Sequence, residues 1–240
     1  MSIDSLDWRK LVAEFVGTFT LVFIGAGAIV MGASLVAVAL AHGFAIAVMV
    51  SAFGHISGGL FNPALTLGLW VTRRLDHLDT VAYIIVQLLG AIVGAAALLV
   101  LYPDVLRDAS DLGTPSLGPG IDTVQGIGIE GVLTFFLMLV VFGTMLDKRG
   151  PALGGIAIGL VLTMDVIAGG ALTGAAMNPA RALGPALVSG VWDGHLVYWV
   201  GPIVGAVLAA LLYHYAFMEQ EEQVAAGVPE APATREGGPV

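Results

Sequence analysis

The sequence contains no cysteine. This absence excludes disulfide bonds, thiolate metal sites and thiol catalysis within these 240 residues. Charged residues are also scarce, at 11% of the chain, whereas 58% of the residues are hydrophobic. The mean hydropathy of +0.93 is far above that of a soluble globular domain. We therefore predict an all-α integral membrane protein embedded in a lipid bilayer.

Basic charge is the scarcer sign. The chain has 9 Lys and Arg against 18 Asp and Glu, for a net charge of −9. Most of the acidic residues lie in predicted loops and in residues 219–240, so nucleic acid is not an expected partner. Residues 219–240 are rich in Glu, Ala, Pro and Gly without an apolar period, which predicts a disordered, acidic, cytoplasmic tail. Residues 1–218 are expected to form one channel domain.

Long apolar runs are what the sequence has in abundance. A membrane-spanning helix needs about 20 apolar residues. Two further stretches, 62–72 and 178–189, are too short to span, because a helix of that length covers about 15 Å of a roughly 30 Å hydrocarbon core. We expect two re-entrant half-helices there and six spans at about 11–31, 35–54, 80–102, 126–146, 152–172 and 194–217.

The two halves of the chain repeat each other, at about 9–102 and 126–217. Glu130 lies 116 residues after Glu14, and Asn178 lies 116 residues after Asn62. Each half holds three predicted spans, an odd number, so the halves must cross the membrane in opposite directions. The sequence therefore predicts an inverted internal repeat.

Pairs of glycines four residues apart occur inside three of the predicted spans. Such spacing lets helix backbones approach closely, so we interpret these glycines as packing positions and not as ligand sites. The pairs are Gly90 and Gly94, Gly155 and Gly159, and Gly201 and Gly205.

Lysine and arginine placement predicts the orientation. Basic residues gather in segments that six spans place on one side, and this side should be cytoplasmic. The connection 103–125 is acidic, as expected outside. Both termini are then cytoplasmic, and we expect the cell membrane. The basic residues are Arg9, Lys10, Arg73, Arg74, Lys148 and Arg149.

Two copies of Asn-Pro-Ala organise the chain: Asn62-Pro63-Ala64 and Asn178-Pro179-Ala180. Asn is a favoured N-cap, and Pro is favoured at the first helical position. Each triplet therefore predicts a helix that begins at membrane depth, where its free amides need a water-filled cavity. Two such starts at matching places indicate a transport site. A purely structural capping role is the alternative.

The second triplet continues as Arg181-Ala182-Leu183-Gly184-Pro185-Ala186. With the repeat, this set resembles the aquaporin (major intrinsic protein) family from Glu14 to about Tyr213. The resemblance implies a homotetramer with one passive pore per protomer. The pore would carry water and small neutral solutes (ammonia, urea, hydrogen peroxide), exclude protons and ions, and need no cofactor or enzymatic chemistry. Ala182, Ala186 and Tyr198-Trp199 match the water-conducting branch.

The resemblance also assigns site residues. Asn62 and Asn178 match the paired pore asparagines, and the selectivity filter falls on His42, Val166, Ala175 and Arg181. This filter is similar to that of plant vacuolar-membrane (tonoplast) intrinsic proteins. A histidine that only packs between helices is the alternative reading of His42.

Buried carboxylates complete the set. Glu14 and Glu130 match family residues that hold the half-helix loops by accepting backbone amides, a structural role. Leu60 stands where a histidine is common in the family, which makes that vestibule less polar. Asp165 lies in the fifth span, and the sequence does not identify its partner. We interpret Asp165 as a structural hydrogen-bonding group.

Three other classes remain open from sequence. An ion- or proton-coupled secondary transporter also uses inverted repeats and broken helices, but the deep charges form no evident relay. A membrane enzyme is disfavoured because the spans contain no nucleophile–base pair or metal-ligand cluster. A structural or adhesive membrane protein with a closed pore is the third class.

The absence of cysteine generates a direct prediction. A thiol-reactive mercurial should leave water flux through the purified protein unchanged, because the chain offers no thiolate to attack. Stopped-flow light scattering on proteoliposomes measures this flux with and without the reagent. Inhibition at a stoichiometric dose would contradict the prediction.

Overall fold

The computed structural model describes residues 6–218, and all regular structure within that range is helical. Six helices within residues 6–218 are long and apolar enough to cross a membrane, as predicted. The predicted tail at 219–240 lies outside the described residues. The spans are α1 (Trp8–Thr20) continued by η2 (Leu21–Ala26) and α2 (Gly27–Val30), α3 (Leu35–Ser57), α5 (His77–Leu101), α7 (Thr123–Val141) continued by η4 (Phe142–Leu146), α8 (Gly154–Thr173) and α10 (Val197–Ala216).

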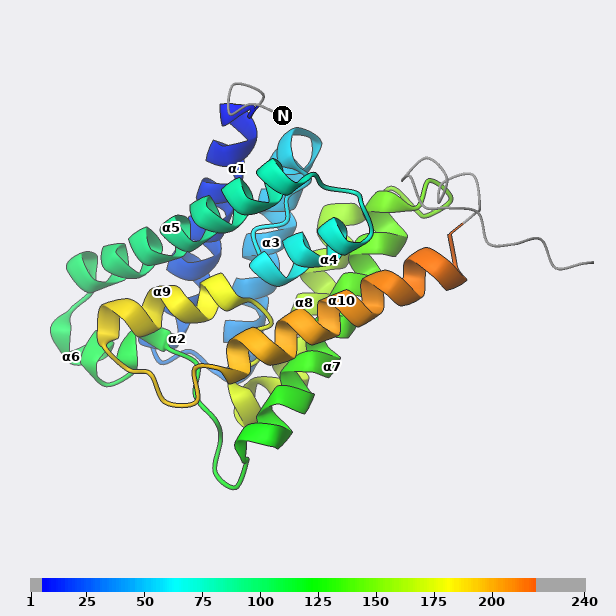
Figure 1. Cartoon of the computed structure of the whole chain (residues 1–240). Coiled ribbons are helices and arrows are strands. Elements are labelled where there is room, and N and C mark those ends of the chain that lie inside the picture. Colours follow the sequence, from blue (N-terminus) through cyan, green and yellow to red (C-terminus); the bar gives the residue numbers. More distant parts are fainter. Residues whose placement is uncertain (1–5, 219–240) are drawn as a thin grey trace, which may run out of the picture.

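Two short helices occupy the middle of the bundle, between α5 and α10 (Figure 1). They are α4 (Pro63–Val71) and α9 (Pro179–Ser189), of 9 and 11 residues. These lengths correspond to about 15 Å each, half a hydrocarbon core. Helix α4 packs on α10, while α9 packs on α5. The predicted half-helices are therefore confirmed, and each is supported by a span.

The connection 103–125 contains structure that the sequence analysis did not anticipate. A short helix, α6 (Asp104–Asp108), is followed by a 3₁₀ turn, η3 (Asp111–Gly113). Gly113 at the end of this turn is buried and lies against Ala26 of the first span. The connection thus folds back onto the bundle, and this brings a backbone carbonyl to the site described below.

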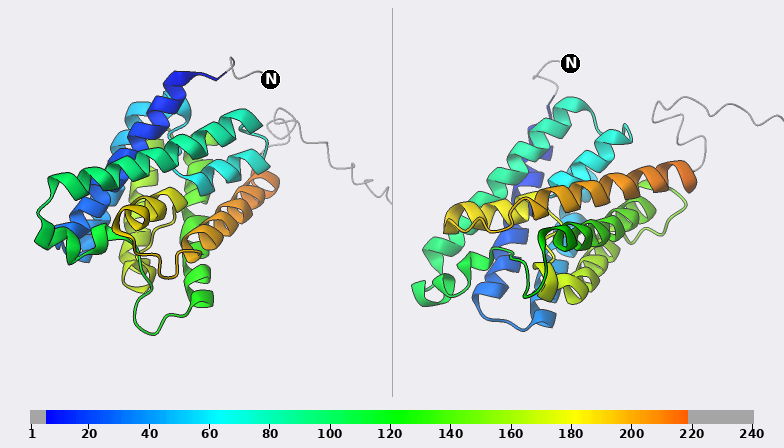
Figure 2. Two further views of the ribbon diagram at one scale, coloured as in Figure 1. Left: turned by 60° about the vertical axis from the view of Figure 1, so that its left-hand side comes forward. Right: turned by 60° about the horizontal axis from the view of Figure 1, so that its bottom comes forward.

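The glycine pairs pack as predicted. The helix pairs α7 and α10, α3 and α8, and α1 and α5 form the main contacts of the bundle, and two further views show α7 and α10 side by side (Figure 2). A Cβ atom on Gly205 would collide with the Gly131 carbonyl, and one on Gly90 would collide with the Phe15 carbonyl. The glycines are therefore required for close backbone approach.

Hydrogen bonds link the C-terminal end of α10 to the loop that precedes α8. The Asp147 carboxylate accepts hydrogen bonds from the Arg149 Nε atom at 2.9 Å and from the Tyr213 hydroxyl at 3.1 Å. The guanidinium of Arg149 also donates to the Phe217 carbonyl. The Arg149 hydrogen bonds hold the pKa of Asp147 well below its usual range. The carboxylate therefore stays ionised, and the contact persists, at neutral and mildly acidic pH.

The packing predicts a contrast between two glycines. Gly205→Ala should lower the free energy of unfolding by about 1–3 kcal/mol, because the new methyl group meets backbone that cannot yield. Gly128→Ala, in α7, is the matched control: a Cβ atom there meets nothing within 4 Å, and Ala is the better helix former. Thermal unfolding of the purified variants in detergent measures the difference. Equal stabilities would contradict the packing argument.

Candidate functional site

The two asparagines of the repeated triplets are the N-caps of the half-helices. The Asn62 Oδ1 atom accepts from the Ala64 amide at 2.9 Å, and the Asn178 Oδ1 atom accepts from the Ala180 amide at 3.0 Å. Both asparagines have extended backbone, and a proline follows at the first helical position. The local sequence thus starts both helices by the same mechanism.

The amide nitrogens of the same side chains link the two halves. The Asn62 Nδ2 atom donates to the Met177 carbonyl, and the Asn178 Nδ2 atom donates to the Phe61 carbonyl, both at 2.8 Å. The half-helices therefore meet N-terminus to N-terminus. Each amide has two hydrogens, so one remains for a further acceptor. The sequence analysis missed these crossed bonds, because their partners are more than a hundred residues apart.

The loops before the half-helices adopt matching strained conformations. Phe61 and Met177 have φ values of 48° and 51°, in the left-handed region, and Ala175 has a φ of 44°. An L-residue in this region costs roughly 1–2 kcal/mol. Gly59, at the position equivalent to Ala175, has a φ of 62°, which glycine adopts without that cost. Strong interactions are needed to hold these loops.

Glu14 holds the first loop. One carboxylate oxygen accepts from the Ser57 hydroxyl at 2.6 Å and from the Leu60 amide at 3.0 Å. The other oxygen accepts from the Phe61 amide at 2.7 Å and from the Gln87 side chain at 2.8 Å. Four donors surround this fully buried carboxylate, which compensates for its removal from water.

Glu130 holds the second loop in the same way. Its carboxylate accepts from the Thr173 hydroxyl at 2.7 Å, the Ala176 amide at 2.9 Å and the Met177 amide at 2.6 Å. The third and sixth spans match at a separation of 115 residues, as shown by Tyr83 and Tyr198, which donate to the Ser57 and Thr173 carbonyls. Pro202 occupies the place equivalent to Gln87, so the donor that Gln87 supplies has no counterpart among the described residues. Glu14 and Glu130 therefore contact the atoms that the resemblance implied. Gln87, a buried amide in an apolar span, was the overlooked signal.

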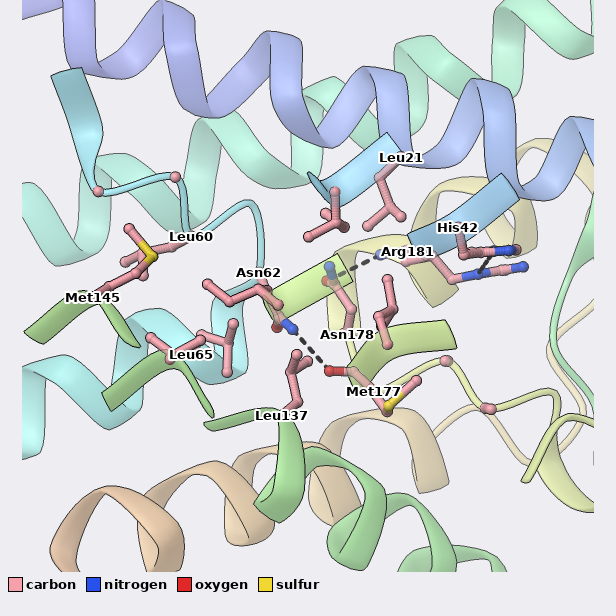
Figure 3. A pocket seen from close by; sticks show the side chains of 18 residues that line it. Leu21, His42, Leu60, Asn62, Leu65, Leu137, Met145, Met177, Asn178 and Arg181 are labelled. Carbon is pink, nitrogen blue, oxygen red and sulfur yellow. Dashed lines mark hydrogen bonds between the residues drawn. The ribbon is translucent and has the colours of Figure 1, made fainter. Parts of the chain in front are cut away.

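A narrow cavity runs past the two asparagines (Figure 3). Leu60 and Met145 lie toward one end, and His42 and Arg181 lie toward the other. About 20 Å³ of the cavity can hold the centre of a water molecule, and one water needs roughly 10–15 Å³. This space has room for only one or two water molecules, so the cavity is narrow. Much of its wall is apolar, from Leu21, Ile46, Leu65, Leu137, Val141, Ile158 and Leu162.

Arg181 and His42 form the polar end of the cavity. The Arg181 Nε atom donates to the His42 Nε2 atom at 3.3 Å, and its Nη1 atom donates to the Gly113 carbonyl at 2.8 Å. The His42 Nδ1 atom lies 2.9 Å from the Val38 carbonyl, to which it donates. The imidazole is therefore neutral, because its other nitrogen accepts from arginine.

One nitrogen of the Arg181 side chain is buried without a partner in the described part of the chain. Arg181 is 1% exposed, and its buried Nη2 atom has no hydrogen-bond partner in the described structure. Arg181 lines both the central cavity and a more open adjoining cavity of about 310 Å³ by the same measure. Such a buried donor is costly unless a passing molecule satisfies it.

The other filter positions predicted from sequence are apolar. Ala175 lines the central cavity, and Val166 lines the adjoining cavity, which also borders Arg181. Leu60 lines the opposite end, as expected for a less polar vestibule. Asp165 is 1% exposed, and its Oδ2 atom has no hydrogen-bond partner within residues 6–218. The structural hydrogen bond expected for Asp165 is thus not seen at that atom.

Comparisons with known proteins agree with this architecture. A family model described as "Major intrinsic protein" matches residues 2–213. Aquaporin TIP4-4 of Zea mays is 44% identical over 227 residues, covering 88% of each chain. Aquaporin-4 of Mus musculus is 38% identical, covering 90% of this chain and 69% of that protein. The X-ray structure of the aquaglyceroporin from Plasmodium falciparum superposes with a TM-score of 0.78 at 27% identity, over 87% of this chain and 96% of the other.

The loop anchors generate a prediction. Glu130→Gln replaces an acceptor oxygen with an NH₂ group, which leaves one buried loop amide without a partner. The expected cost is about 1–3 kcal/mol in the free energy of unfolding, and flux through the cavity should fall because Met177 no longer fixes Asn62. Thermal unfolding and flux are measured together, with Gly128→Ala as the neutral control. Unchanged values in both would show that Glu130 does not hold the loop.

Proposed function

Because this chain belongs to the major intrinsic protein family and is a passive water channel of the membrane, we propose that its pore also passes small neutral solutes and excludes protons and ions. The solutes that fit are ammonia, urea and hydrogen peroxide. The cavity at Asn62 and Asn178 is the path, and His42, Val166, Ala175 and Arg181 form the filter.

One observation carries the solute assignment: the polar part of the constriction is confined to one side. Arg181 and His42 supply the hydrogen-bonding groups, while Ala175 and Val166 present only small or branched apolar surface. The free Arg181 Nη2 atom can donate to a carbonyl or a peroxide oxygen. A neutral imidazole and two apolar residues leave more room than a filter with a second polar side chain would.

Cation exclusion is supported by the charges that face the cavity. The N-termini of α4 and α9 meet at the crossed asparagines. Each helix N-terminus is equivalent to roughly half a positive charge. The guanidinium of Arg181 adds a full charge one turn further along the path. A cation or hydronium is repelled by this arrangement, while a neutral dipole only reorients.

The placement in the cell has separate support. The basic residues next to the spans favour cytoplasmic termini, with the Leu60 end of the cavity on the cytoplasmic side. We also propose a homotetramer, on the basis of family resemblance. The sequence favoured the cell membrane, but the resemblance to plant vacuolar-membrane channels favours an internal membrane. Imaging of a tagged chain in its native cells decides between the two.

The filter yields the test of this proposal. Arg181→Val removes the guanidinium and widens the constriction, so urea flux should rise relative to water flux. Stopped-flow light scattering after an osmotic step, first with impermeant sucrose and then with urea, gives the two fluxes for each variant. Shrinkage in sucrose with a low activation energy, followed by re-swelling in urea, is the expected wild-type behaviour.

The control for this test is Gly128→Ala, which faces open space away from the cavity. An unchanged urea-to-water ratio in Arg181→Val would argue that Arg181 does not line the constriction. A wild-type flux that saturates and depends on a pH gradient would instead support coupled transport.

A further inference from the structure

The His42 ring rests directly against the backbone of the first span. A Cβ atom built on Gly25 would lie 2.5 Å from both the Cδ2 and the Nε2 atoms of His42, and 2.8 Å from its Cε1 atom. Real Cβ atoms do not approach other atoms this closely. A side chain at position 25 would therefore require the imidazole to shift.

The segment around Gly25 is a π-helix, η2 (Leu21–Ala26), within an otherwise α-helical span. Such turns are rare and are frequent at functional sites. Here the π-helix contacts both hydrogen-bond partners of the Arg181 guanidinium. Gly25 lies against His42, and Ala26 lies against Gly113, whose carbonyl accepts from Arg181. The η2 segment thus packs against both groups that accept hydrogen bonds from the Arg181 guanidinium.

Two hydrogen bonds restrain the imidazole in its place beside Gly25. Its Nδ1 atom is tied to the Val38 carbonyl at 2.9 Å, and its Nε2 atom accepts from Arg181 at 3.3 Å. His42 and Arg181 both line the cavity, where the imidazole ring and the guanidinium lie close together (Figure 3). Because the ring lines the cavity, displacing it from Gly25 would change the space beside Arg181.

The repeat shows the same space filled differently at the other end of the cavity. With the separation of 116 residues, Gly25 corresponds to Val141 and His42 corresponds to Ile158. Val141 and Ile158 both line the cavity. At one end of the cavity the pair is a glycine and a histidine, and at the other end the equivalent pair is two branched aliphatic residues.

We propose that Gly25 is a positioning residue that sets the width of the filter by seating the His42 ring against the π-helix, clear of the path. Gly25 acts through His42 and does not itself contact the solute. This role rests on the proposed filter at His42 and Arg181, whereas the water measurement that tests it needs only the water channel.

The test is a double-mutant comparison in proteoliposomes that contain equal amounts of protein. Gly25→Ala should lower water permeability per protein on the order of three- to tenfold and lower urea flux further still. His42→Ala removes the ring, so Gly25→Ala/His42→Ala should conduct like His42→Ala alone. Gly128→Ala is the matched control and should conduct like the wild type.

Each outcome decides the proposal. A loss of flux on adding Gly25→Ala that is the same with and without His42 would overturn it, as would no loss in the single variant. If Gly25→Ala alone does not fold, a double variant that folds and conducts like His42→Ala supports the clash with the ring. A double variant that also fails shows that alanine at position 25 is intolerable even without the ring, which overturns the proposal.

The urea arm separates this inference from the proposed function. A wild-type protein that conducts water but excludes urea would refute the proposed urea permeability. The water comparison among the Gly25, His42 and Gly128 variants would still decide the role of Gly25.

Discussion

The structure depends on two buried carboxylates that hold strained loops. Glu14 and Glu130 each accept hydrogen bonds from two consecutive loop amides and from the hydroxyl of residue 57 or 173. Irregular backbone at membrane depth is tolerated only where its polar groups are satisfied by protein or by water in a cavity. The carboxylates meet this requirement, and the loops can then bring two helix N-termini together.

The crossed asparagine bonds turn two separate loops into one unit. Because each asparagine caps its own helix and also donates to the opposite loop, a shift in one half moves the other. This coupling places the remaining amide hydrogens at one point on the path. A water molecule that reaches this point meets two donors and, along much of the wall, apolar side chains.

The two ends of the cavity differ although the halves repeat. At one end the imidazole of His42 lies between Gly25 and Arg181. At the other end Val141 and Ile158 fill the equivalent space with aliphatic groups. Arg181 has its partners at the first end because the connection 103–125 folds back to present the Gly113 carbonyl. The proposed filter therefore lies where the two halves of the repeat differ.

The amino-acid sequence by itself determined the spans, the half-helices and their caps. These depend on apolar run length and on residues close together in the chain, such as Asn62 before Pro63, so local chemistry is sufficient. It also indicated the glycine packing positions, because their spacing places them on one helix face. Only the tertiary structure decided the crossed bonds, the donation from Gln87, the Gly113 carbonyl beside Arg181 and the place of Gly25 under His42. Each of these joins atoms from distant segments, and their meeting depends on how whole helices pack, which no local pattern specifies.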